Sequence, residues 1–144
     1  MKQEDKQLLL KSLCAMLPYG VKIWYKYYPD KITEQFATSI RLVDGKIALS
    51  RKFDKEGDWY PIEEANELLI KPYLRPMSSM TEEEKEEYNE SIRKDVDVII
   101  DAMKRGENSG AGFYKMDFLY SHHFDYYGLI PIGLALEAPE GMYK

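Results

Sequence analysis

The sequence predicts an α+β fold in which a small antiparallel β-meander packs against two or three helices. Three observations carry this prediction: an Asp-Gly pair between two alternating apolar runs, a helical apolar pattern at 4–17, and a longer one at 81–105. At 144 residues the chain fits one domain over 1–144, large enough to bury roughly two thirds of the surface that its unfolded form exposes.

A first helix is predicted at 4–17, with Pro18 and Gly20 ending it. Five residues with helical spacing form its apolar face: Leu9, Leu10, Leu13, Cys14 and Leu17. Cys14 is interpreted as a small apolar filler on that face. Because the chain has one cysteine, an internal disulfide is excluded, and a reducing cytoplasmic location is expected.

Two β segments are expected next. Apolar and polar residues alternate from Val21 to Tyr28, and a second run from about Glu34 to Val43 ends at Asp44-Gly45. Asp-Gly favours a two-residue hairpin turn, in which both residues have positive φ. Such a turn sets the strand register. It pairs Val43 with Lys46, Leu42 with Ile47, Ile40 with Leu49, and Phe36 with Phe53.

The middle of the chain predicts a short helix over 61–70, starting at Pro61, and then an arm over 71–77. Pro72 and Pro76 favour an extended arm, which is expected to cross the surface together with the C-terminal tail. Thr81 and Glu84 then form a capping box for the helix over 81–105. Its apolar stripe is predicted at five positions: Tyr88, Ile92, Val96, Ile99 and Met103. A short helix is predicted at 113–121.

The aromatic and basic strand at 22–28 is one candidate binding surface. One of its faces carries Lys22, Trp24, Lys26 and Tyr28. Exposed rings beside lysines are typical of sheets that bind single-stranded nucleic acid. The structural alternative is a tryptophan covered by a helix, with lysines that protect a sheet edge from aggregation.

Two further candidates lie later in the chain. Tyr73 and Arg75 belong to the proline arm, where the guanidinium could meet a carboxylate or phosphate of a partner, or pin the arm itself. His122, His123 and Asp125 are the cluster most like a metal or acid–base site. Adjacent helical residues point about 100° apart, so the bland interpretation is a histidine packed at a helix end and an aspartate capping the next turn.

The charge distribution bears on the class of partner. The net charge is −5, yet the segment 19–53 carries +4 and the remainder −9. Long-range attraction of nucleic acid by the whole molecule is therefore disfavoured, while a local basic face is retained as an alternative. No apolar run approaches the roughly 20 residues of a membrane span, so no membrane partner is expected. The oligomeric state stays open.

Three segments carry a resemblance: KPYLRPMSSMTEEE at 71–84, HHFDYYGLI at 122–130 and GLALEAPEGMY at 133–143. They resemble uncharacterised small proteins of Bacteroides-type gut bacteria and their prophages. The resemblance covers mainly the second half of the chain, together with Leu-Pro-Tyr-Gly at 17–20. It implies a bacterial or phage cytoplasmic protein from mobile DNA, and it transfers no catalytic residue.

The favoured hypothesis is a non-enzymatic binding or accessory protein of a prophage or mobile element, with a protein partner and no cofactor. Its contact residues would be Trp24, Lys26, Tyr28, Tyr73 and Arg75. One alternative is a metal-assisted hydrolase or nuclease that uses His122, His123 and Asp125. The other is single-stranded nucleic-acid binding through the strand at 24–28.

Overall fold

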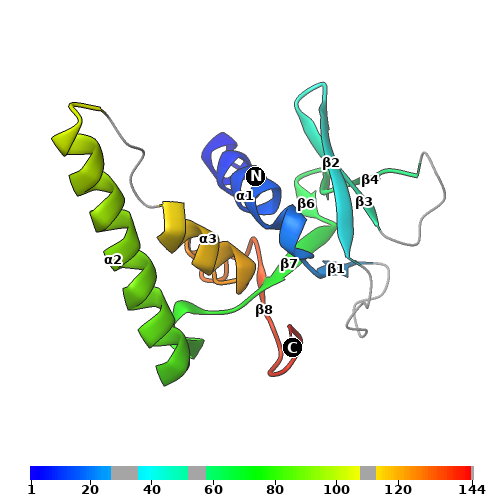
Figure 1. The fold of residues 1–144 in the computed structure, drawn as a ribbon. Helices are drawn as coiled ribbons and strands as arrows, with labels where there is room; N and C mark the ends of the chain where they lie inside the picture. The colour runs from blue at the N-terminus through cyan, green and yellow to red at the C-terminus, as the bar shows by residue number, and fades with distance from the viewer. Residues whose placement is uncertain (27–35, 52–57, 108–112, 144) are drawn as a thin grey trace.

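The computed structural model describes residues 1–26, 36–51, 58–107 and 113–143. It is an α+β structure, as predicted, with helices at one side and three small sheets at the other (Figure 1). The main core is formed by α1 (Gln3–Met16), β1 (Ile23–Tyr25), β3 (Lys46–Arg51) and β7 (Ile70–Leu74) with the C-terminal tail. A second small cluster joins α3 (Phe113–Ser121) to α2 (Glu82–Lys104). Across the described residues, no helix has the length and apolar character to span a membrane.

Helix α1 (Gln3–Met16), followed by the 3-10 turn η1 (Leu17–Tyr19), confirms the first predicted helix. Leu9, Leu13 and Met16 are its buried apolar residues. Cys14 is exposed, so its interpretation as an apolar filler is wrong. The reason is its position around the helix. The buried face is centred on Leu9, Leu13 and Met16, and Cys14 lies about 100° from Leu13, on the side away from that face.

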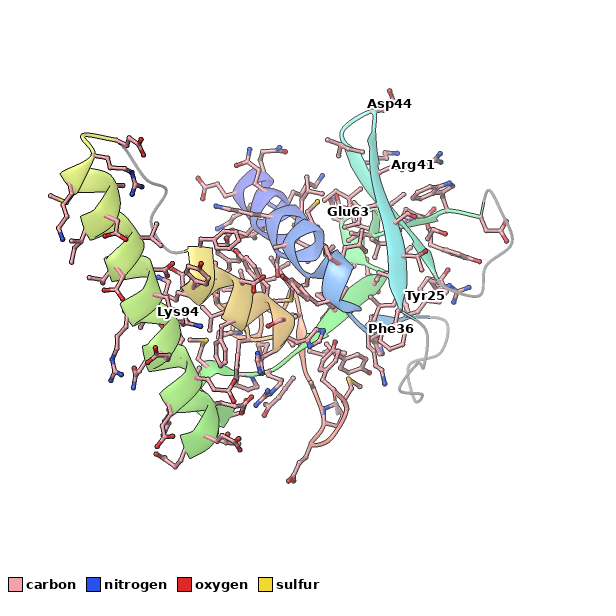
Figure 2. All side chains as sticks on the ribbon, in the orientation of Figure 1. Tyr25, Phe36, Arg41, Asp44, Glu63 and Lys94 are labelled. Atoms are coloured by element: carbon pink, nitrogen blue, oxygen red, sulfur yellow. The ribbon has the colours of Figure 1, made fainter. Side chains whose placement is uncertain are left out.

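The hairpin of β2 (Ala37–Val43) and β3 (Lys46–Arg51) confirms the predicted turn. Asp44 and Gly45 have φ of 52° and 74°, and Asp44 lies at the tip of the hairpin (Figure 2). The predicted register holds over three of its pairs: Val43 with Lys46, Leu42 with Ile47, and Ile40 with Leu49. A register shift between Ala37 and Ser39 ends this pattern, and Phe36 instead bridges to Lys22. Phe53 lies outside the described residues.

The predicted helix over 61–70 is wrong. The segment forms β4 (Tyr60–Pro61), β5 (Glu63–Glu64), β6 (Glu67–Leu68) and the start of β7 (Ile70–Leu74). Ala65 and Asn66 both have positive φ, 49° and 67°, and they turn β5 back onto β6. The hairpin forms in place of the predicted helix because the helical pattern of this segment is weak and Asn66 tolerates the left-handed conformation that the turn needs.

The proline arm is also not a surface segment. Its first half is β7, the central strand of a sheet ordered β1-β7-β8, where β1 is Ile23–Tyr25 and β8 is Leu136–Glu137. Bonds from Tyr73 N to Lys22 O and from Lys26 N to Leu69 O join β7 to β1. Pro72 lies opposite Ile23 at a position where the two strands exchange no hydrogen bond, so its missing N–H costs this strand pair nothing. A proline is therefore tolerated inside this sheet.

Helix α2 (Glu82–Lys104) begins with the predicted capping box of Thr81 and Glu84. It packs against α3 (Phe113–Ser121), which lies between α2 and the rest of the molecule (Figure 1). The predicted apolar stripe is only partly inward. Tyr88, Ile92 and Ile99 are half-buried, while Val96 and Met103 are exposed. The buried positions of α2 are Ser91, Asp95 and Ala102. They lie on a face about 80° around the helix from the predicted stripe, and this is the face on which α3 packs.

Candidate binding groove around Trp24

The histidine cluster lies where α3 ends. His123 has φ of 61° and occupies the position after the helix that glycine usually takes. Its backbone N–H donates to Tyr120 O, and Phe124 N–H donates to Leu119 O, which completes a Schellman motif. The His123 ring is buried and stacks on Tyr143 with 3.7 Å between ring centroids. Burial lowers the pKa of His123, so the ring is neutral at pH 7.

The three members of the cluster do not converge on one point. His122 Nδ1 lies 2.9 Å from Phe118 O at the end of α3, His123 Nε2 lies 3.1 Å from Tyr19 O, and the Asp125 carboxylate accepts from two backbone amides. The bland interpretation of end-packing histidines and a capping aspartate is confirmed. Within the described ranges no group of three His, Cys, Asp or Glu side chains forms a metal-ligand set.

Arg75 is an internal clamp. Its guanidinium donates to both oxygens of Glu84 at 2.7 Å and lies 4.3 Å from the Phe124 ring centroid. Of the two predicted roles, pinning its own arm is therefore the one that the geometry supports. The bond from Arg75 lowers the pKa of Glu84 to about 2, with Thr81 adding further bonds. This pair ties β7 to the first turn of α2.

Tyr73 is likewise occupied inside the fold. Its side chain is buried, and its carbonyl accepts the hydroxyl of Tyr143 at 2.6 Å. The same hydroxyl accepts Lys22 N–H at 2.9 Å, so Tyr143 fastens the C-terminal tail across β1 and β7. The contacts of Tyr73 and Arg75 described here are thus internal to the fold. Tyr28 lies outside the described residues.

Trp24 and Lys26 do line a common groove, of about 450 Å³. Strand β1 places them there because its alternation buries Val21, Ile23 and Tyr25 on the other face. The walls come from the chain start, β1, the β5–β6 hairpin, β7 and the tail: Met1, Asp5, Trp24, Lys26, Asn66, Glu67, Leu68, Lys71, Ile132, Gly133 and Leu134. We call this hollow the Trp24 groove.

Charges of both signs surround the apolar part of the Trp24 groove. Lys26 pairs with Glu67, and Lys71 Nζ lies 5.9 Å from the Trp24 ring centroid. From the tail, Ile132 lines the groove with 52% exposure, and Leu134 lines it as a buried residue. The groove therefore offers an aromatic and aliphatic floor with acids and lysines at its rim. An apolar side chain fits this floor, and a carboxylate next to it fits beside Lys71.

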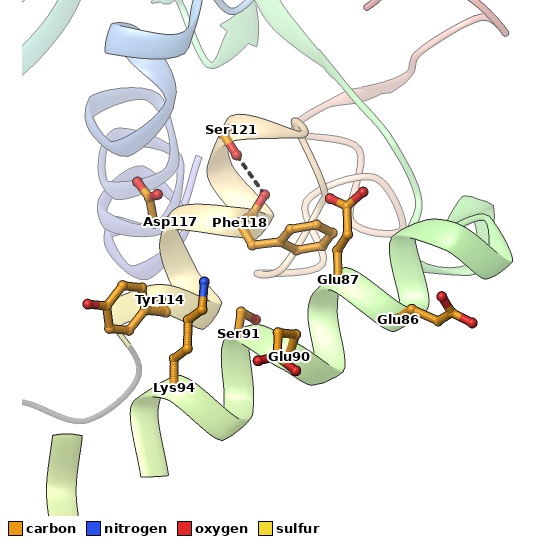
Figure 3. Close-up of a pocket in the computed structure, with 9 residues that line it drawn as sticks. All are labelled: Glu86, Glu87, Glu90, Ser91, Lys94, Tyr114, Asp117, Phe118 and Ser121. Carbon is orange, nitrogen blue, oxygen red and sulfur yellow. Dashed lines mark hydrogen bonds between the residues drawn. The ribbon is translucent and has the colours of Figure 1, made fainter. Parts of the chain in front are cut away.

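A second groove, of about 510 Å³, runs between α2 and α3 (Figure 3). Glu86, Glu87 and Glu90 line it from α2, and Asp117 is among the residues that line it from α3. Two of its acidic groups have partners in the fold: Tyr19 donates to Asp117, and Glu90 pairs with Arg93. The hydrogen bond to Asp117 raises the pKa of Tyr19. The sequence alone does not predict this groove, because the second helix that lines it lies later in the chain.

Comparison with known proteins adds no further assignment. No family model, no curated protein and no solved structure matches the chain.

Proposed function

We propose that the chain is a non-enzymatic binding protein that holds a segment of a protein partner in the Trp24 groove. The observation that carries the proposal is the convergence of Trp24, Lys71 and Ile132 from three separate segments on one hollow. Large aromatic side chains in a concave setting are typical anchors of protein interfaces. An accessory role in a prophage or mobile element is part of the proposal through the sequence resemblance alone.

The lining also supports a partner chemistry. Trp24, Leu68 and Ile132 present apolar surface, so the segment that binds should carry an aliphatic or aromatic side chain. A carboxylate beside it would meet the ammonium group of Lys71 at the rim of the groove, and such charge complementarity favours one orientation.

Single-stranded nucleic acid is the weaker fit to the same groove. Lys26 is paired with Glu67, and Asp5 is a second carboxylate in the lining. Both acids would repel phosphates, and the net charge of −5 opposes long-range attraction.

The test is a selection of peptides from a random displayed library on the immobilised full chain. Selected peptides are then measured by fluorescence anisotropy against wild type, Trp24→Ala and Trp59→Ala, since the chain has two tryptophans and only Trp24 lies in the groove. We expect Trp24→Ala to weaken binding at least tenfold and Trp59→Ala to change it less than twofold. Circular dichroism confirms that both variants fold.

Two results would overturn the proposal. One is a selection that enriches no peptide, or peptides that bind Trp24→Ala as tightly as wild type. The other is binding of an oligothymidine 20-mer whose affinity falls steeply with salt and is lost in Trp24→Ala with Lys26→Ala, which would assign the groove to nucleic acid.

A further inference from the structure

Contacts between the segment 139–143 and the rest of the fold are centred on one tyrosine. The first three residues of the segment are exposed, and Met142 and Tyr143 are half-buried. Figure 1 shows the segment near the red end of the chain, which extends from β8 at the edge of the molecule. The contacts of Tyr143 therefore decide whether the segment stays in place.

Tyr143 completes the end of the β1–β7 ladder. Its hydroxyl accepts Lys22 N–H at 2.9 Å and donates to Tyr73 O at 2.6 Å. Tyr73 N–H donates directly to Lys22 O, so the hydroxyl takes the place of the second bond that this antiparallel residue pair would exchange. Release of Tyr143 would leave one donor and one acceptor of the ladder without this partner.

The His123 ring lies flat on Tyr143, with 3.7 Å between ring centroids and 7° between ring planes. His123 is only 6% exposed, and its Nε2 lies 3.1 Å from Tyr19 O. A carbonyl oxygen can only accept, so Nε2 carries the hydrogen of the neutral ring and Nδ1 does not. Nδ1 is buried and has no hydrogen-bond partner among the described residues.

A proton on Nδ1 is unfavourable in this arrangement. It creates a buried donor without an acceptor, on a ring that has also become a cation. The charges of His122 and Arg75 oppose the proton as well. Attraction between the charged ring and the face of Tyr143 does not provide the hydrogen bond that Nδ1–H would lack.

In the described part of the chain, the elements around the ring supply no carboxylate to it. Four acids of these elements have other partners: Asp117 with Tyr19, Glu84 with Arg75, Glu87 with His122, and Asp125 with two backbone amides. Lys22 of the β1 segment is a further cation, and its Nζ lies over the Phe36 ring. The Tyr143 hydroxyl is neutral at pH 7 because burial raises its pKa.

We propose that His123 is a pH-dependent switch, in which a proton from solvent on Nδ1 drives the ring out of its stack and releases the segment 139–143. The direction follows from the proton affinity of the two states. Burial lowers the pKa of His123 in the stacked state, and His122 and Arg75 lower it further. In solvent the ring regains its ordinary value of 6.5. The stacked state is therefore fully stable above pH 6.5, and each pH unit below that value favours release by up to about tenfold.

Release of the segment leaves the main core in place. Leu129, Leu134 and Ala135 hold the preceding part of the tail in that core. The Asp125 carboxylate also accepts Leu129 N–H, and this bond does not involve the ring. The switch therefore acts on the end of the β1–β7 ladder rather than on the whole fold.

The test follows the segment by NMR between pH 7.5 and pH 5. Heteronuclear NOE values of the amides at 140–142 report picosecond-to-nanosecond motion, and imidazole nitrogen shifts report the charge of each of the two histidines. In wild type we expect the NOE values to fall below pH 6.5, with the midpoint at which His123 takes up its proton. The ratio of released to stacked chains should rise by up to about 30-fold between pH 7.5 and pH 5.

Two variants separate the switch from a general effect of acid. His123→Phe keeps an aromatic ring against Tyr143 without a nitrogen that takes a proton, so the segment should stay rigid at pH 5. His122→Asn removes the other histidine and should still show the release. Where His123→Phe does not fold at pH 7.5, agreement of the two wild-type midpoints decides. A segment that stays rigid down to pH 5, a release whose midpoint differs from the His123 titration, or the same release in His123→Phe would overturn the proposal.

Discussion

At the scale of single residues, the fold relies on polar side chains that bond from one element to another. Arg75 and Glu84 join β7 to the start of α2, and Tyr143 bonds to backbone groups of both β1 and β7. Each of these side chains is chemically suited to bind a partner. In this fold, however, their donors and acceptors form hydrogen bonds inside the molecule.

The Arg75–Glu84 pair predicts a pH-dependent loss of stability. Glu84→Gln should lower the free energy of unfolding at pH 7 by about 1 kcal/mol, since it weakens a charge-assisted pair that is partly screened by solvent. The pKa of Glu84 is about 2 in the folded chain against an ordinary value of 4.5. The carboxylate therefore stabilises the fold above pH 4.5, and this contribution disappears as the pH falls towards 2.

Urea unfolding of wild type and Glu84→Gln between pH 7 and pH 2 measures this difference. It should shrink steadily below pH 4.5. The control is Glu82→Gln, because Glu82 is an exposed glutamate of the same helical turn that pairs only with Lys85. If both variants lose the same free energy at pH 7, the pair with Arg75 has no special role.

At the scale of elements, local turn chemistry decided which predictions held. The β2–β3 hairpin and its register were predictable because Asp44-Gly45 carries the signal in two adjacent residues. The β5–β6 hairpin was missed because its turn, Ala65-Asn66, lacks glycine. Strand β7 was missed because Pro72 disfavours a central strand in general. Pro72 is tolerated here because the hydrogen bonds to the β1 segment are made by residues on either side of it, Tyr73 and Leu69.

A side-chain methyl group is unfavourable at both turns, so adding it at one and removing it at the other should change stability in opposite directions. Gly45→Ala should lower the free energy of unfolding by about 1 kcal/mol, because a Cβ is disfavoured at φ of 74° although it meets no atom within 4 Å. Ala65→Gly should raise it by about 0.5 kcal/mol, since relief of the left-handed strain exceeds the entropy that glycine adds to the unfolded chain. Thermal unfolding of both variants tests this, and a shift of the same sign in both would contradict it.

The contact of α2 with α3 depends on a buried carboxylate. Asp95→Ala should cost about 1–2 kcal/mol, because the first amides of α3 lose their cap. Hydrogen exchange at Tyr114 and Lys115 should accelerate. Asp97→Ala, two residues along and exposed, is the matched control. Unchanged exchange at both amides in Asp95→Ala would show that the cap is dispensable.

At the scale of the whole molecule, long-range assembly limits what the sequence predicts about the site. Trp24 and Lys26 were identifiable because strand alternation is local. Lys71 and Ile132 were not, since they reach the Trp24 groove only when β7 pairs with β1 and the tail folds beside them. The apolar stripe of α2 was recognised from the sequence but is only partly buried, because its pattern does not specify which face α3 covers.

The most direct test of the Trp24 groove is a titration of the ¹⁵N-labelled chain with a peptide from the library selection, followed by NMR. The two tryptophans give two indole N–H signals that can be assigned from Trp24→Phe and Trp59→Phe. The account predicts a saturable shift of the Trp24 indole, with shifts at Lys71 and Ile132, while the Trp59 indole stays in place. A shift of the Trp59 indole or of α2 signals, with the Trp24 indole unmoved, would contradict it.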